Sequence, residues 1–223
     1  MQLLNQAETQ PIILRRLEVK DIPQLQRLHE DWFPIRYNDS FYNNAGQGLW
    51  ENGEPLFTQV ALFGPNEDII GAVTAQIQRS EDAEDKQLVQ SKDGTLMYIL
   101  TLGARQDFRR KGIASVLLSA CINEAKMAPS CCALYLHVKA DNTSAIRFYE
   151  KNGFQRVRFL EDYYFINGQN HHAYLYIRYV NGGIAPLKWF DVIARPFTMF
   201  VEMWHKLFGD GQLHSSDKAM SIV

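Results

Sequence analysis

The feature that most constrains this chain is an uncharged run of ten residues, TLMYILTLGA at 95–104. A run this long and apolar is typical of a strand that is covered on both faces, and such strands lie inside α/β sheets. After the polar stretch RQDFRRKG at 105–112, apolar residues recur at helical spacing from Ile113 to Ala120. The sequence therefore predicts a buried strand that leads directly into a helix.

Other segments extend this pattern along the chain. Further β-like runs occupy 12–17, 57–64, 68–78 and 132–140, helical spacing is found at 22–28 and 141–153, and 154–180 is typical of two strands around an Asn167-Gly168 turn. Mixed strands with crossover helices predict an α/β fold, with a mixed sheet covered by helices on both faces, over residues 12–183.

Three segments do not fit the regular pattern. Residues 31–48 are rich in Asn, Gly, Pro and aromatic side chains, which predicts a turn-rich loop with a short helix near 40–42. The acidic stretch at 80–94 is predicted to be a solvated connector, and the His171-His172 pair a solvated part of the last hairpin. Residues 1–11 are predicted to be a flexible N-terminus.

Composition and charge exclude several classes of protein. The net charge of −2 gives no basic field, so we expect no nucleic-acid partner. The three cysteines, Cys121, Cys131 and Cys132, are odd in number and lack C-x-x-C spacing, so we expect reduced thiols in a cytoplasmic protein with no metal site. The sequence contains no stretch of about 18 consecutive apolar residues, so we expect no membrane-spanning helix.

The junction FRRKG at 108–112 places three cations and a glycine at the start of the predicted helix. Free backbone N–H groups and the helix dipole favour an anion at this position, and Gly112 permits its close approach. The motif is not a P-loop, because Lys111 precedes the glycine. These features favour a pyrophosphate group, although a basic helix start on an ordinary surface gives the same pattern.

Two spaced motifs resemble those of the GNAT acetyltransferases. R-x-x-G-x-A at 109–114 is similar to the family's pyrophosphate motif, and DNTSAIRFYEKNGF at 141–154 is similar to its N-x-x-A-x-x-F-Y-x-x-x-G-F signature. The resemblance implies the GNAT fold and acetyl-CoA as co-substrate. The implied acetyl-CoA contacts fall on Leu102, Gly103, Ala104, Arg110, Lys111, Gly112, Ile113, Ala114, Ser115, Asn142, Tyr149, Glu150, Lys151 and Asn152.

Within that family the chain resembles the N-terminal acetyltransferases, which implies further roles. Tyr98 and His137 match the general bases, and Tyr149 matches a candidate thiolate stabiliser or general acid whose rival role is core packing. The N–H of Leu100 is implied to polarise the thioester carbonyl, and Tyr37 and Tyr164 to bind the peptide. Without the resemblance, ordinary packing is the favoured interpretation of Tyr98, His137, Tyr37 and Tyr164, whereas Tyr149 fits both roles equally.

The resemblance implies protein N-termini that begin with methionine as substrates, notably those of transmembrane proteins with cytosolic ends. At pH 7, removing the proton from an α-amine costs roughly 1.4 kcal/mol against roughly 4.6 kcal/mol for a lysine. Lysine acetylation, including that of histones, and a non-catalytic CoA-binding module tethered to a membrane are the alternatives. Arg36 stands where relatives carry an acidic residue, which leaves the second-residue preference open.

The segment 184–223 is predicted to be an amphipathic helical tail. Its apolar residues recur at helical spacing, with a break near Pro196, at Leu187, Phe190, Ile193, Phe197, Val201, Trp204 and Phe208. Flanking lysines and an arginine suit a membrane interface over 184–208, although the same face could cover the domain. The resemblance implies peripheral attachment to the cytosolic face of the Golgi membrane.

Overall fold

The computed structural model describes residues 11–186 except 51, 84 and 86. Nearly all of the predicted flexible N-terminus and of the predicted amphipathic tail lies outside the described residues. The predicted domain, in contrast, lies within them almost completely.

In the described part of the chain, seven strands form one mixed sheet in the order β1-β2-β3-β4-β5-β7-β6. Among these strands, β4 and β5 are the one parallel pair, and the other neighbours are antiparallel. The bounds are β1 Ile13–Arg16, β2 Leu56–Phe63, β3 Asp68–Arg79, β4 Thr95–Ala104, β5 Cys131–Lys139, β6 Gln155–Ile166 and β7 Gln169–Tyr179. The predicted mixed α/β sheet is confirmed.

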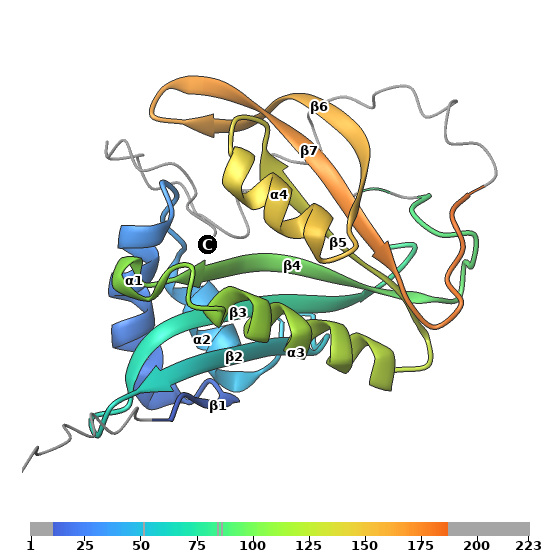
Figure 1. The fold of residues 1–223 in the computed structure, drawn as a ribbon. Helices are drawn as coiled ribbons and strands as arrows, with labels where there is room; N and C mark the ends of the chain where they lie inside the picture. Colours follow the sequence, from blue (N-terminus) through green and yellow to red (C-terminus); the bar gives the residue numbers. More distant parts are fainter. Residues whose placement is uncertain (1–10, 51, 84, 86, 187–223) are drawn as a thin grey trace, which may run out of the picture.

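Helices lie on both faces of this sheet, with α3 in front of it and α1 behind it in the view of Figure 1. A Cβ atom built on Gly71 of β3 would meet Ile113 of α3, whereas one built on Gly103 of β4 would meet Trp32 of α1. The bounds are η1 Val19–Asp21, α1 Ile22–Trp32, α2 Asp39–Gln47, η2 Gln106–Phe108, α3 Ile113–Met127 and α4 Thr143–Lys151, where η marks 3₁₀ turns.

The α2 helix corrects the prediction of a turn-rich loop with a short helix at 40–42. The helix has nine residues, and the side chain of Asn38 caps it by accepting a hydrogen bond of 2.9 Å from the Phe41 N–H. Gly48 ends it in the left-handed conformation, with φ of 71°. Asn38 and Gly48 are therefore the start and stop signals of this helix, which the prediction from the sequence does not include.

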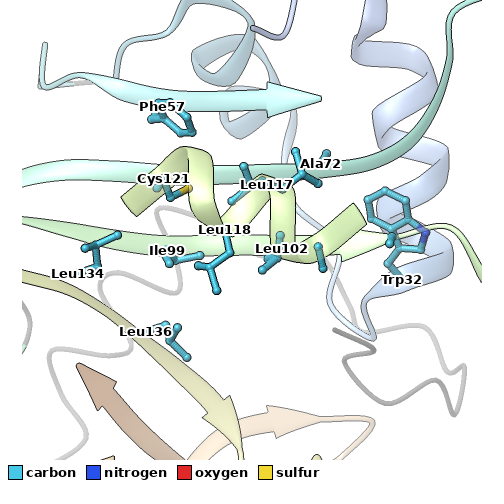
Figure 2. Close-up of a cluster of buried hydrophobic side chains, with 14 of the residues drawn as sticks. Trp32, Phe57, Ala72, Ile99, Leu102, Leu117, Leu118, Cys121, Leu134 and Leu136 are labelled. Carbon is cyan, nitrogen blue, oxygen red and sulfur yellow. The ribbon is translucent and has the colours of Figure 1, made fainter. Parts of the chain in front are cut away.

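The main core includes the packing of α3 against the sheet, and it also contains Trp32 of α1 and Phe41 of α2. Figure 2 shows Leu117, Leu118 and Cys121 of α3 beside Ile99 and Leu102 of β4, and all five are buried. The run 95–104 is the strand β4 residue for residue, and all but its first residue and Leu100 are buried. Because packed side chains cover both faces of this strand, charged residues are absent from it and the apolar run is continuous.

A second apolar cluster covers the opposite face near β5 and β7, and the connector at 80–94 forms part of it. Leu88 and Val89 pack against Leu96, Tyr135 and Ile177. The prediction of a wholly solvated connector is therefore wrong. The physical reason is that no described helix covers this part of the sheet, so the connector buries its own apolar residues there.

Candidate active site

The parallel pair β4 and β5 separates partway along its length. Pairing joins Thr95 through Tyr98 of β4 to β5, whereas the rest of β4 pairs only with β3. A register shift in the β3–β4 ladder lies at Leu100, between the pairs formed by Thr101 and Ile99. Beyond Tyr98 the strands therefore diverge, and backbone groups of β4 on that side have no strand partner.

The predicted pair of Tyr98 and His137 meets where the strands begin to diverge. The Tyr98 hydroxyl oxygen lies 3.0 Å from His137 Nδ1, and both side chains are buried. The Tyr98 ring stacks on Tyr135 with 4.6 Å between ring centroids. This packing restricts the Tyr98 ring, so its hydroxyl faces the imidazole in a fixed geometry.

A second tyrosine, which the sequence reading did not select, contacts the same ring nitrogen. The Tyr163 hydroxyl lies 2.8 Å from His137 Nδ1, and the two rings stack with centroids 4.4 Å apart. The sequence reading chose its neighbour, Tyr164. Because adjacent strand residues usually point to opposite faces, the YY pair gave no means of knowing that both would be buried.

The other side of the His137 ring faces an acidic residue from the connector. Nε2 lies 3.5 Å from Asp85 Oδ2, which is longer than a well-formed hydrogen bond, and the Arg158 guanidinium donates to the other carboxylate oxygen. Burial alone would raise the pKa of Asp85, but the His137 ring and Arg158 outweigh it and hold that pKa below its usual value. Asp85 thus remains ionised beside the imidazole.

The anion site predicted at the start of α3 is a cavity of about 250 Å³. Gly112 is the N-cap, with φ of 85°, and no side chain caps the first turn. The predicted contact residues that line the cavity are Ala104, Arg110, Gly112, Ile113, Ala114, Ser115 and Lys151. The uncapped N–H groups and these cations suit a diphosphate.

The cations of the junction differ in position. Arg109, the first residue of the predicted pyrophosphate motif, lines the cavity, whereas the predicted contact Lys111 is not among its lining residues. The Lys111 ammonium lies 4.9 Å from the centroid of the Phe108 ring instead. A Cβ atom on Gly112 would meet no protein atom within 4 Å, so its positive φ, rather than crowding by the protein, accounts for the glycine.

The predicted contacts on α4 also have roles in building the helix. Asn142 caps it by accepting from the Ala145 N–H at 3.1 Å, and the Asn152 side chain donates to the Phe148 carbonyl at 2.8 Å. Glu150 accepts a hydrogen bond from the Tyr176 hydroxyl. Each residue type is thus explained by local structure, which neither requires nor excludes contact with a ligand.

Tyr149 is fully buried in the main core between α4 and the sheet. Burial raises the pKa of its phenol far above the ordinary value, with a smaller contribution from Cys121. The phenol is therefore protonated at neutral pH and can donate a hydrogen bond but cannot act as a base. Core packing and the thiolate-stabilising role remain compatible.

Tyr37 lies in the segment between α1 and α2, and Tyr164 lies on β6. Tyr37 follows α1 and stacks on Phe41 with centroids 4.4 Å apart. Burial, and then the neighbouring hydroxyls of Tyr42 and Tyr164, raise the pKa of Tyr37. Arg36 points outward beside them, 68% exposed and 3.9 Å from Glu30.

The remaining sequence predictions concern thiols, metals and membranes. Cys121, Cys131 and Cys132 are free thiols, and burial raises the pKa of Cys131 to about 11. Within residues 11–186, apart from the three gaps, no group of three or more candidate ligands could hold a metal ion. In the same part of the chain, no helix combines the length and the hydropathy that a membrane crossing requires.

Known proteins are similar to this chain in sequence and in architecture. Residues 22–154 match the Acetyltransferase (GNAT) family. N-alpha-acetyltransferase 60 of Xenopus tropicalis is 37% identical over 181 residues, which covers 78% of this chain and 72% of that protein. Histone acetyltransferase MCC1 of Arabidopsis thaliana is 34% identical over 176 residues, covering 77% of this chain and 71% of that protein.

Two solved structures agree with these matches. Arabidopsis thaliana NAA60, crystallised with acetyl-CoA and with a bisubstrate analogue, superposes on 77% of this chain with a TM-score of 0.71 and 36% identity. The match covers 100% and 99% of those chains, respectively. Together with the family match and the site geometry, they show that this chain belongs to the GNAT acetyltransferase family and is an acetyl-CoA-dependent acyltransferase related to the N-alpha-acetyltransferases.

Proposed function

We propose that this enzyme transfers the acetyl group of acetyl-CoA to the free α-amine of proteins that begin with methionine, notably transmembrane proteins with cytosolic N-termini. The observation that carries the proposal is the contact between Tyr98 and His137 where β4 and β5 diverge. There the two groups can accept a proton close to the open edge of β4. The relatives named N-alpha-acetyltransferase support an amine acceptor at a protein N-terminus.

The reaction requires a neutral amine. The ammonium proton passes to the Tyr98–His137 pair, directly or through a water molecule, and the amine nitrogen then attacks the thioester carbonyl carbon. The carbon–sulfur bond breaks, and the thiolate leaves with the electron pair. The nitrogen loses its second proton as the amide forms, and the thiolate takes up a proton to become the thiol of CoA. Ionised Asp85 beside Nε2 favours the proton on that nitrogen, which leaves Nδ1 as the acceptor that faces the two tyrosine hydroxyls.

Acetyl-CoA is positioned by the groups at the other end of β4. The first turn of α3 and its cations hold the pyrophosphate, and backbone groups of Leu102, Gly103 and Ala104 hold the pantetheine arm. The Leu100 N–H, at the register shift, polarises the thioester carbonyl. The protonated phenol of Tyr149 is the candidate donor to the leaving thiolate.

The peptide enters between Tyr37, which follows α1, and Tyr164 on β6, and the resemblance of both to peptide-binding tyrosines supports a clamp on its first residues. A second candidate function is lysine acetylation, which is favoured by the similarity to a protein named histone acetyltransferase. Its larger deprotonation cost, roughly 4.6 kcal/mol at pH 7, predicts a slower reaction. The non-catalytic module is disfavoured because the Tyr98–His137 contact is intact.

A peptide panel with acetyl-CoA distinguishes these functions. Each peptide begins with methionine and is offered with a free or a blocked α-amine, and with or without one internal lysine. We expect an acetylated product, detected by the increase in peptide mass, only where the α-amine is free. Product on blocked peptides would replace the proposal with lysine acetylation, and no product on any peptide, with CoA still bound, would favour the binding module.

We also propose that residues 184–208 hold the enzyme at the cytosolic face of the Golgi membrane, on the basis of their apolar spacing and flanking cations. Removal of residues 184–223 should shift the protein from the membrane fraction to the soluble fraction of a cell extract. The matched control retains the tail but replaces Trp204 with alanine, for which we expect a partial shift. Unchanged fractionation of the truncated protein would eliminate this proposal.

A further inference from the structure

The strand β6 contains an irregularity at the point where it contributes to the active site. Leu160 lies opposite Ala173 and Tyr164 lies opposite His171, so β6 advances four residues while β7 advances two. The two extra residues form a bulge, and Asp162 within it has a φ of 49°. Left-handed backbone is disfavoured for residues other than glycine, so this conformation needs local support.

His172 supplies that support from the facing strand. The Asp162 N–H donates a hydrogen bond of 3.0 Å to His172 Nδ1. The His172 backbone carbonyl in turn accepts from the Ala140 N–H at 2.9 Å, which fixes the residue at the end of β5. The sequence predicts a solvated histidine here, and the side chain is indeed 51% exposed, but its ring nitrogen serves as an acceptor for the bulge.

The bulge determines where the next two side chains point. In a regular strand, Tyr163 and Tyr164 would face opposite sides of the sheet. Here both are buried in the same cluster, with their rings edge to face and centroids 4.8 Å apart. Tyr163 reaches His137 Nδ1, and Tyr164 packs against the Tyr163 ring.

We propose that His172 is a positioning residue for acetyl transfer. The hydrogen bond to its Nδ1 holds the bulge that presents Tyr163 to the catalytic imidazole and Tyr164 to the incoming peptide. His172 contacts neither the reacting atoms nor, by its position on β7, the cavity that suits the pyrophosphate. The proposal rests on the proposed function, because it concerns the turnover of a peptide substrate.

Three substitutions in the full-length enzyme test this role. His172→Leu retains bulk against the Phe159 ring, whose centroid lies 5.2 Å from that of His172, but removes the acceptor. His172→Asn places an amide oxygen at the position of Nδ1 and restores it. His171→Leu, the matched control, changes the adjacent residue of the same strand and leaves the acceptor in place.

The kinetic readout separates positioning from general loss of structure. For His172→Leu we expect kcat to fall and the peptide KM to rise, with kcat/KM lower by roughly 3- to 10-fold, the range that one backbone hydrogen bond supports. The KM for acetyl-CoA should not change. His172→Asn should recover most of the loss, and His171→Leu should match the wild type.

A second readout does not depend on activity. Amide hydrogen exchange at Asp162 should be slow in the wild type and in His172→Asn, and faster in His172→Leu. An unaltered kcat/KM or unaltered exchange in His172→Leu, failure of asparagine to restore either, or equal impairment by His171→Leu would each overturn the proposal. If the wild type acetylates no peptide, the proposed function fails, while the exchange data still decide whether His172 holds the bulge.

Discussion

The substitution Gly112→Glu tests the anion site at the start of α3. Gly112 has a φ of 85°, and a Cβ atom built on it meets nothing within 4 Å. The only cost of a side chain within the protein is therefore its left-handed backbone, about 1–2 kcal/mol. This is a fraction of the roughly 5–15 kcal/mol by which a domain is stable, so the variant should fold.

The effect on acetyl-CoA binding is expected to be larger. At a separation of about 6 Å and an effective dielectric constant of about 40, each pair of like charges repels by about 1.4 kcal/mol. Two phosphate charges would thus weaken binding by about 3 kcal/mol, or roughly 100-fold in Kd. The carboxylate also occupies the space in front of the first N–H groups of α3, which adds to this loss.

Gly112→Ala is the matched control, because it carries the same backbone cost without the charge. Both variants should melt about 2–8 °C below the wild type. Titration calorimetry with CoA should show a Kd close to that of the wild type for alanine and about 100-fold weaker for glutamate. Equal CoA affinity in the glutamate and alanine variants would refute the assignment of the pyrophosphate to this cavity.

Four further substitutions test the site and the core. Tyr98→Phe and His137→Ala should each lower kcat by roughly tenfold or more with the Kd for CoA nearly intact, as measured by single-turnover kinetics and calorimetry, and unaltered rates would remove these residues from proton transfer. Asp21 accepts hydrogen bonds of 2.6 and 3.0 Å from the Arg15 guanidinium. Burial would raise the pKa of Asp21, but these bonds outweigh it and lower the pKa. The ionised carboxylate therefore stabilises the folded state above about pH 4, and this stabilisation is lost in more acidic solution. Asp21→Asn should therefore lower the free energy of unfolding by about 1–3 kcal/mol at pH 7 and make little difference near pH 2, and urea titrations that give the same deficit at both pH values would contradict the assignment. Thr74 is buried, and its hydroxyl has no hydrogen-bond partner among the described residues. Thr74→Val should therefore raise the free energy of unfolding by about 1 kcal/mol, whereas destabilisation in the same assay would show that the hydroxyl is satisfied.

The sequence determined the elements whose signals are local. The uncharged run at 95–104 coincides with β4, and the Asn167-Gly168 dipeptide forms the turn between β6 and β7. Likewise, the glycine after the cations at 109–111 begins α3. Each signal depends on the conformational preferences of a few consecutive residues, which do not change when the rest of the chain folds around them.

Only the tertiary structure decided which side chains surround His137. Tyr98, Tyr163 and Asp85 come from β4, β6 and the connector, and each is distant from His137 in sequence. A strand pattern gives the face of a residue only while the strand is regular, and the bulge in β6 alters the direction of Tyr163.

Asp85 shows the same limit for charge. In the sequence it belongs to an acidic stretch typical of a solvated loop, yet the connector must cover the apolar face of β5 and β7. Closing the connector over that face brings the carboxylate to His137 and Arg158, which compensate for its burial. Burial and ion pairing depend on where distant segments pack, and local residue preferences do not contain that information.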